Sequence, residues 1–526
     1  MSKNKVHRRD FLKTTAAGAA ALSLTAASAR RVLGANERIG VGFLGVGGRC
    51  QEHLAVINKL HKENQGVAPV AVCDVWDGNK EVQSGGGRGL YPSAEKVGLK
   101  PDDTTHVTKD FRKVLDLKEV DVVCIATPDH WHAKMSIEAA KAGKDVYCEK
   151  PMTRTIDEAH AVVDAMKKLN KVMTVGVQSM ADPTWMKANE IIRKGDIGHV
   201  CQAQTSYYRN YIGGQWRYYK LTKDMTPKTI DWDMFVGHDF SVIDGVPLSK
   251  KIPFDRAVYG QWRCYWPFGG GMFTDLFVHQ TTHMISAMGV RYPGRVVGGG
   301  GLYLEYDERD VPDVATIIAD YNEGCQLIVT ATMINDHPIE EVIRGRLATI
   351  RFGDRDSASA RTNDKPRKEF GLEILPQSMK SGPGLPKRLQ NMKGEFIPGG
   401  LTGNDTEALW KNFLQCVRDR NRETLSTPEL GAAAFTTVNM GVLSYRQGRA
   451  LFWDAEKRQP ITADASWAAR LEQRSKKRGH PDQIIGWQGG DTGSVVIPPD
   501  YQKLGGAWID GKDPAEGAGS AAGGQN

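Results

Sequence analysis

The hydrophobic positions of residues 38–178 fall into short apolar runs separated by longer amphipathic stretches. Apolar runs cover residues 38–44, 68–75, 120–128, 145–151 and 172–178, and helical patterns cover residues 49–60, 132–144 and 155–171. Near-continuous apolar strands between amphipathic helices are typical of a parallel sheet that is buried on both faces. The pattern predicts an α/β protein with an N-terminal Rossmann doubly wound parallel sheet over residues 36–178. In such sheets, ligands bind beyond the carboxyl ends of the strands.

The pattern changes after residue 178. Residues 207–219 and 261–271 crowd tyrosine, tryptophan and arginine between glycines, and residues 314–321 and 325–333 have the composition of strands. They predict a C-terminal α+β domain, residues 179–475, with a mixed or antiparallel sheet. Residues 476–526 are rich in glycine and proline with little apolar periodicity, and we expect an extended tail there.

The first 35 residues have the layout of an export signal. Arg8 and Arg9 precede Phe11 and Leu12, an alanine-rich stretch follows, and the small residues 27–29 provide a cleavage site. This order predicts a twin-arginine signal peptide. The apolar stretch is shorter than the roughly 20 residues that span a bilayer, so we expect no stable membrane insertion. The predicted location is periplasmic or otherwise extracytoplasmic.

Composition excludes some classes of partner. The 526 residues carry a formal net charge of +7, but acidic and basic residues interleave along the chain and form no basic stripe, so no nucleic-acid partner is expected. The eight cysteines include no C-x-x-C pair, which disfavours a zinc cluster and a disulfide framework. The length suits two domains with tails.

A glycine-rich turn follows the first predicted strand. Gly45, Gly47 and Gly48 lead into a helix, where backbone N–H groups can approach a pyrophosphate. Cys50 stands at the position of the third glycine of G-x-G-x-x-G, which weakens the fingerprint without removing it.

The second predicted strand ends at Asp74. A carboxylate there accepts hydrogen bonds from a ribose 2′-hydroxyl and repels a 2′-phosphate, so NAD is expected and NADP is less favoured. The open point is whether Arg88 or Lys80, on the following loop, neutralises this carboxylate.

Residues 42–49, 126–151 and 195–200 together resemble the Gfo/Idh/MocA family of nicotinamide-dependent oxidoreductases. The likeness runs from about residue 38 to about residue 454 and is nearest to the exported members with twin-arginine signals. The resemblance implies a large open sheet in the second domain and a sugar or cyclitol substrate. It also implies that Lys150, in the E-K-P motif, points at the substrate beside the nicotinamide.

Asp275 and His279 lie four positions apart, so on a helix they share a face. Oxidation of an alcohol needs a base for the hydroxyl proton, and the pKa of histidine suits that task. The resemblance to the family's D-x-x-x-H motif makes this pair the acid–base group, with Asp275 orienting His279. A further aspartate common in the family is Thr282 here, and the adjacent His283 could compensate.

The pattern and the resemblance together give the expected site. The catalytic residues are Lys150, Asp275 and His279. Cofactor contacts are expected at Gly45, Gly47, Gly48, Arg49, Asp74, Thr127, Pro128, His132, Glu149, Lys150 and Gln178. Substrate contacts are expected at Lys150, Trp262, Arg263, Trp266, Asp275 and His279. Of the aromatic residues Tyr207, Tyr208, Trp216, Trp262 and Trp266, we expect about half to fill a core and the rest to face a polyol.

A metal site is the competing use of the histidines. The pairs His130/His132 and His279/His283, with Asp275, could be assembled around an ion. No H-E-x-x-H pattern occurs and the family reaction needs no metal, so none is expected.

These features predict an exported NAD-dependent oxidoreductase acting on a carbohydrate or cyclitol hydroxyl, as a homo-oligomer (dimer or tetramer). One alternative is a glycoside hydrolase that oxidises, eliminates and re-reduces its substrate on bound NAD. The other is a carbohydrate-binding protein that has lost turnover.

Because free dinucleotide is scarce outside the cytoplasm, we expect NAD to be held tightly. Residues 84–103, or those just after the signal, are expected to cover its adenine or pyrophosphate.

Overall fold

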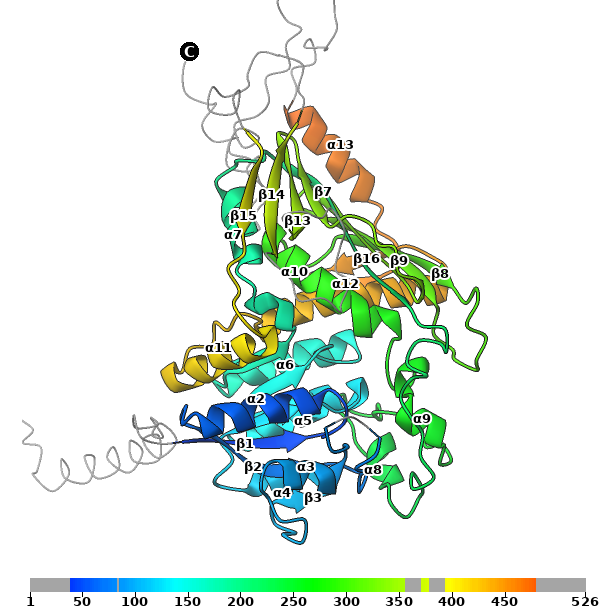
Figure 1. Cartoon of the computed structure of the whole chain (residues 1–526). Helices are drawn as coiled ribbons and strands as arrows, with labels where there is room; N and C mark the ends of the chain where they lie inside the picture. The colour runs from blue at the N-terminus through cyan, green and yellow to red at the C-terminus, as the bar shows by residue number, and fades with distance from the viewer. Residues whose placement is uncertain (1–37, 83–84, 355–369, 378–392, 479–526) are drawn as a thin grey trace, which may run out of the picture.

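The computed structural model describes residues 38–82, 85–354, 370–377 and 393–478 (Figure 1). The predicted signal peptide and nearly all of the predicted tail lie outside the described residues. The described chain builds two sheets. None of the helices in this part of the chain combines the length and the apolarity needed to cross a bilayer.

The first sheet has six strands in the order β3-β2-β1-β4-β5-β6, all paired in parallel. Its strands are β1 (Ile39–Leu44), β2 (Val67–Cys73), β3 (Val107–Thr108), β4 (Val122–Ile125), β5 (Asp145–Glu149) and β6 (Met173–Gly176). Its helices are α2 (Cys50–Lys62), α3 (Leu90–Lys96), α4 (Phe111–Asp116), α5 (Asp129–Lys141) and α6 (Ile156–Lys168). Every residue of β1, β4 and β5 is buried, which explains their unbroken apolar runs. The predicted doubly wound sheet is confirmed.

The strand order reverses between β1 and β4, and a crevice opens at such a switch point. Gly45 follows β1, Asp74 follows β2, Thr127 lies just beyond β4 and Lys150 follows β5. Because parallel strands share one carboxyl edge, these four residues meet at the same rim.

The second sheet has eleven strands in the order β15-β14-β13-β12-β7-β10-β9-β8-β16-β17, with β11 beside β7. Its strands are β7 (Val200–Asn210), β8 (Arg295–Gly301), β9 (Val314–Tyr321), β10 (Cys325–Thr332), β11 (Ile334–Asn335), β12 (Val342–Gly345), β13 (Ala348–Asp354), β14 (Phe370–Pro376), β15 (Glu395–Pro398), β16 (Leu451–Asp454) and β17 (Gln459–Ile461). β7 and β10 pair in parallel and the other pairs are antiparallel, so the predicted large mixed sheet is confirmed.

Helices separate the second sheet from the first domain (Figure 1). A π-helical turn (Phe273–Phe277) leads directly into α10 (Val278–Met288), and α10 packs against α7 (Thr184–Arg193) and α12 (Pro428–Gln447). The remaining helices are η1 (Gln178–Ala181), α8 (Trp232–Val236), α9 (Arg256–Gly260), η2 (Trp262–Cys264), α11 (Asp405–Asp419) and α13 (Trp467–Arg478). Since α12 also contacts α6 and β8, it joins the two sheets.

Helix α11 returns from the second sheet to the first domain. It packs against α2, and Trp410 is fully buried with the side chains of β1. The Trp410 ring stacks on Tyr147 with centroids 4.2 Å apart, and its Nε1 donates a hydrogen bond to His53 Nδ1 at 2.9 Å. The first core therefore includes residues far beyond 178, and the predicted boundary between the domains stays a prediction.

Candidate active site

Two adjoining cavities open at the carboxyl edge of the first sheet. We call the one beside Asp74 the dinucleotide cavity and the one beside Lys150 the substrate cavity. Their shared lining makes them one continuous groove: Gly48, Arg49, Arg88, Ala126, Thr127, Tyr219, Trp262 and Arg263 belong to both.

The glycine-rich turn forms one wall of the dinucleotide cavity. Gly45 has φ +81°, and a Cβ atom there would lie 2.6 Å from Thr127 Cγ2, so only glycine fits. A Cβ on Gly47 would meet nothing within 4 Å, which leaves its backbone open to a ligand. This cradle fits the pyrophosphate of a dinucleotide.

Asp74 lies on the same wall and is 8% exposed. Its Oδ1 accepts a hydrogen bond from the backbone N–H of Trp76 at 2.9 Å. Burial raises the pKa of Asp74 to about 6, although Arg88 and Lys109 act against that shift. Lys80 instead pairs with Glu95 at 2.6 Å, so of the two cations considered above, Arg88 is the one that lines the cavity.

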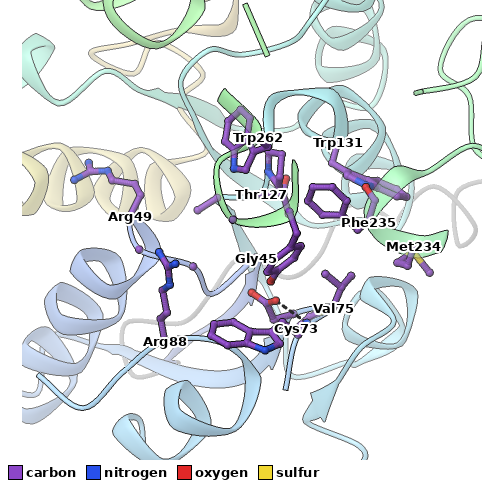
Figure 2. A pocket seen from close by; sticks show the side chains of 18 of the residues that line it. Gly45, Arg49, Cys73, Val75, Arg88, Thr127, Trp131, Met234, Phe235 and Trp262 are labelled. Atoms are coloured by element: carbon purple, nitrogen blue, oxygen red, sulfur yellow. Dashed lines mark hydrogen bonds between the residues drawn. The ribbon is translucent and has the colours of Figure 1, made fainter. Parts of the chain in front are cut away.

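The opposite wall includes residues from beyond the first sheet, after residue 178. Figure 2 shows Met234 and Phe235 beside Trp131, across the cavity from Arg49 and Arg88. They belong to residues 224–260, a segment that we call the strap. Of residues 84–103, which were expected to cover the adenine or pyrophosphate, Arg88 lines this cavity, and the strap contributes Met234, Phe235, Tyr259 and Gly260. The other segment considered, just after the signal, lies outside the described residues, so the cover of the cofactor stays a prediction.

Backbone and side-chain bonds hold the strap on the first domain. Ile230 forms an antiparallel bridge with Trp76, and the Asp231 N–H donates to the Val75 carbonyl at 2.9 Å. His130 Nε2 and Trp131 Nε1 bond the Phe235 carbonyl at 2.8 and 3.0 Å. The strap is therefore fixed to the first domain by both backbone and side-chain hydrogen bonds.

In the substrate cavity, the Lys150 ammonium is bound to Asp275. Lys150 Nζ donates to Asp275 Oδ1 at 2.7 Å and to the Asp275 carbonyl at 2.9 Å. Arg263 Nε donates to the same Oδ1 at 3.1 Å, and Trp216 Nε1 donates to Oδ2 at 2.9 Å. Burial works to raise the pKa of Asp275, but Lys150 and Arg263 hold it well below its usual range. Asp275 is therefore ionised and fixes the position of Lys150.

His279 lines the same cavity at 8% exposure. It lies in the first turn of α10, and Asp275 lies in the π-helical turn just before, so both side chains reach the cavity. π-Helical turns are frequent at functional sites. The hydrogen bonds described above connect Asp275 with Lys150, Arg263 and Trp216. Trp216 is fully buried, so it fills a core and supports the site at once.

Arg49 and Glu149 form a buried pair behind the glycine-rich turn. Arg49 Nε donates to Glu149 Oε1 at 2.7 Å, and His53 Nε2 lies 2.9 Å from the same oxygen. Burial works to raise the pKa of Glu149, but Arg49 and His53 hold it well below its usual range. The pair links α2 to the end of β5 and hence to Lys150.

His132 and Gln178 also line the substrate cavity. His132 Nδ1 lies 2.6 Å from the Pro151 carbonyl and Nε2 lies 2.8 Å from the Thr127 carbonyl. Burial favours the neutral ring, yet Cys148 and these carbonyls raise the pKa of His132. His132 thereby ties the loop after β4 to the loop after β5.

Three charged residues of the substrate cavity were not expected: Asp129, Arg209 and Lys220. Asp129 is 4% exposed, and its Oδ2 accepts a hydrogen bond from Thr274 Oγ1 at 2.8 Å. Burial raises the pKa of Asp129 to about 7, although Arg263 opposes the shift. The available signal for Asp129 was its place directly after Thr127 and Pro128.

Trp266, an expected substrate contact, lines neither cavity. Its ring lies 6.5 Å from that of Tyr445 and 5.1 Å from the Arg446 guanidinium, and its backbone N–H donates to Asp310 Oδ1 at 2.8 Å.

Two of the four histidines considered for a metal site, His130 and His283, are engaged elsewhere. Burial lowers the pKa of His130 to about 3, and its Nε2 bonds the strap as described. His283 Nε2 lies 2.7 Å from Glu341 Oε1, and its ring stacks on Trp185 at 3.9 Å. Within the described residues, no group of three His, Cys, Asp or Glu side chains could hold a metal ion.

The fold and the cradle are those of a Rossmann-type dinucleotide-binding domain. Residues 39–177 match the family model described as oxidoreductase family, NAD-binding Rossmann fold. The chain therefore carries the NAD-binding domain of the Gfo/Idh/MocA family, as its motifs predict. Residues 5–25 match the model of the twin-arginine translocation signal, which supports twin-arginine export.

Two kinds of curated relative are similar to this chain. A levoglucosan dehydrogenase of Pseudarthrobacter phenanthrenivorans is 34% identical over 157 residues, which are 28% of this chain and 40% of the relative. An alpha-N-acetylgalactosaminidase of Shewanella oneidensis is 26% identical over 249 residues, 42% of this chain and 52% of the relative. The chain thus spans about half the length of the curated relatives that it matches.

Solved structures show the same fold over a longer range. An aldose-aldose oxidoreductase from Caulobacter crescentus has a TM-score of 0.55 at 17% identity, covering 79% of this chain and 100% of that one. A levoglucosan dehydrogenase in complex with NADH and levoglucosan also has a TM-score of 0.55, at 18% identity, covering 79% and 99%.

Proposed function

We propose that this protein is an exported NAD-dependent oxidoreductase that acts on a hydroxyl group of a sugar, glycoside or cyclitol. The observation that carries the proposal is the position of Lys150, Asp275 and His279 in a cavity that continues into the dinucleotide cradle. The sugar dehydrogenases among the relatives support the substrate class.

The cradle residues Gly45, Gly47 and Asp74 would hold the dinucleotide, whose nicotinamide supplies the acceptor of the hydride. Lys150 donates a hydrogen bond to the reacting hydroxyl and stabilises the negative charge that develops on its oxygen. His279 takes the proton and returns it in the reverse direction. Asp275 keeps Lys150 oriented through the 2.7 Å contact. The aromatic faces of Tyr218, Tyr219 and Trp262, which line this cavity, suit the C–H patches of a sugar ring.

NAD is preferred over NADP in this proposal because Asp74 lies in the cradle, where a 2′-phosphate would meet a carboxylate. We further propose that NAD remains bound throughout turnover, and that the NADH formed when one sugar is oxidised is converted back to NAD in the same site by reduction of a second sugar's carbonyl group. The strap lines the dinucleotide cavity opposite the glycine-rich turn, so release would require its backbone bridge to open. A permanently bound cofactor suits a protein that leaves the cytoplasm.

A second candidate function uses the same residues. A glycoside hydrolase of this kind oxidises a ring carbon, eliminates the aglycone, adds water and reduces the product again. Proteins named glycosyl hydrolase family 109 and the N-acetylgalactosaminidase match a longer part of this chain than the dehydrogenase does, which favours keeping this candidate.

The test begins with protein purified without added cofactor, dialysed, denatured and assayed for dinucleotide. We expect close to one NAD per chain. The holoprotein is then incubated with a panel of glycosides without added NAD, and free aglycone and keto-sugar are both measured. Keto-sugar supports the oxidoreductase, and aglycone release supports the hydrolase. An empty site, with activity only when NAD is added, would refute the proposal that NAD stays bound. Inactivity on every glycoside and polyol, with or without added NAD, would refute the proposal that the protein is an enzyme.

A further inference from the structure

Arg209 lies in the substrate cavity and has no part in the chemistry proposed above. It is the penultimate residue of β7, two positions after Tyr207, so both side chains lie on one face of the strand. Arg209 Nη2 donates to the Tyr207 hydroxyl at 2.9 Å, and the guanidinium carbon lies 4.9 Å from the centre of the Tyr207 ring. That ring is 6.0 Å from the ring of His279. Arg209 is therefore separated from the proposed base by one aromatic side chain.

The guanidinium of Arg209 has an N–H donor without a hydrogen-bond partner in the protein. Its Nε atom is buried and has no hydrogen-bond partner in the protein, and none of the described carboxylates forms an ion pair with it. An arginine side chain offers five N–H donors, and leaving a buried donor unpaired is costly. A buried, unpaired donor on the wall of a substrate cavity indicates that the ligand supplies the acceptor.

The charges around the cavity lead to the same conclusion. Six cationic side chains and three carboxyl groups line it: Arg49, Arg88, Lys150, Arg209, Lys220 and Arg263, against Asp129, Glu149 and Asp275. Glu149 binds Arg49, and Asp275 binds Lys150 and Arg263. Burial raises the pKa of Asp129 to about 7, so this carboxyl group is only partly ionised near neutral pH.

Arg88 also lines the dinucleotide cavity and lies on the side of the glycine-rich turn (Figure 2). Its positive charge can therefore be balanced by the negative pyrophosphate of the dinucleotide. Arg209 and Lys220 line the substrate cavity and are absent from the lining of the dinucleotide cavity. Asp275 acts on Arg209 only beyond ion-pair distance, and none of the described carboxylates forms an ion pair with Lys220, so we assign these two charges to the substrate.

We propose that the substrate is an acidic sugar, a hexuronic acid or its glycoside, whose carboxylate binds to Arg209 with Lys220 as a second cation. The proposal rests on the proposed function and names its substrate class. A planar carboxylate fits the Nε and Nη2 edge of a guanidinium with two parallel hydrogen bonds. With the carboxylate at Arg209, the sugar ring lies beside Tyr207 and its hydroxyl groups face Lys150 and His279.

A phosphate ester fits this wall less well. It carries nearly two negative charges and three acceptor oxygens. Arg209 is half-buried with one unpaired buried donor, and Lys220 is exposed, so the protein offers one desolvated cation. The number of donors matches a carboxylate.

The experiment compares substrates that differ only at C6, using the purified holoprotein with its own NAD. The pairs are p-nitrophenyl glucuronide with p-nitrophenyl glucoside, and the corresponding galacturonide with galactoside, in both anomers. A glucoside 6-phosphate is the third arm. We expect kcat/KM for the preferred uronide to exceed that of its neutral partner by about 10- to 150-fold, the range of a hydrogen bond to a charged group.

Substitution then assigns the preference to Arg209. Arg209→Met should lower kcat/KM for the uronide by the same factor, chiefly by raising KM. For the neutral partner, kcat/KM of this variant should stay within about threefold of the wild-type value. Arg209→Lys should recover part of the preference. Lys223→Met is the matched control, since Lys223 is an exposed cation of the neighbouring loop that lines neither cavity. This variant should leave kcat/KM unchanged for both substrates.

If the wild-type protein turns over neutral glycosides with the same kcat/KM as uronides, this inference is overturned and the proposed function still stands. A preference for the 6-phosphate would overturn the carboxylate assignment. If no glycoside reacts, calorimetric titration with glucuronate and glucose still decides the matter. Tighter binding of glucuronate that is lost in Arg209→Met supports the inference, and equal binding refutes it.

Discussion

Replacing Lys150 by methionine tests the centre of the proposed site. The ammonium makes two hydrogen bonds, at 2.7 and 2.9 Å, both to Asp275, and its side chain is 11% exposed. Methionine keeps most of the length and volume and removes the charge. Removing one preorganised donor of this kind typically costs 10²–10³-fold in turnover, or about 2.7–4 kcal/mol. We expect a loss of roughly that size in kcat for Lys150→Met.

The fold should survive this change because Asp275 is not left unpaired. Arg263 at 3.1 Å and Trp216 at 2.9 Å still bind its carboxylate. The expected loss in the free energy of unfolding is therefore about 1–3 kcal/mol. Bound NAD per chain should stay unchanged, since Lys150 acts on the substrate.

Lys144→Met is the matched control. Lys144 is also a buried lysine, and its Nζ donates to the carbonyls of Leu117 and Val120 at 2.7 and 2.8 Å, away from both cavities. Turnover of the best glycoside, NAD content and urea unfolding are measured for both variants. The control should lose stability and keep its turnover per folded molecule. Turnover of Lys150→Met within about tenfold of wild type would refute the role given to this ammonium.

Three further substitutions probe the remaining groups. His279→Ala should lower turnover by about 10²–10⁴-fold with NAD content unchanged, and a loss below tenfold would place the base elsewhere. Asp74→Ala should shift the affinity ratio of NADP to NAD upward by about tenfold or more in titrations of cofactor-stripped protein, and an unchanged ratio would contradict its contact with the ribose. Asp129 has a pKa raised from 3.8 to about 7, so the folded state holds its proton more tightly and stability falls as pH rises through that window. Between pH 5 and pH 8, urea unfolding should therefore show wild type losing roughly 2–3 kcal/mol more than Asp129→Asn, and parallel losses would refute the shift.

Local sequence determined the first domain and one side of the site. Strands buried on both faces leave continuous apolar runs, and parallel strands place their carboxyl ends on one edge. Gly45, Asp74 and Lys150 could therefore be located from their positions after three such runs, and the structure places all three on the groove. The spacing of Asp275 and His279 likewise predicts a shared cavity, since four positions on a helix return to the same face.

Only the tertiary structure decided what surrounds these residues. Trp216 reaches Asp275 and Arg209 reaches the cavity because β7 and the loop after it lie beside the π-helical turn. This contact joins segments about 60 residues apart, which no local period encodes. The strap and Trp410 join the first domain from beyond residue 178 for the same reason. Trp266 shares its composition and neighbourhood with Trp262, yet only Trp262 lines the groove. A sequence indicates which side chains can bind a ligand, and long-range packing decides which of them face it.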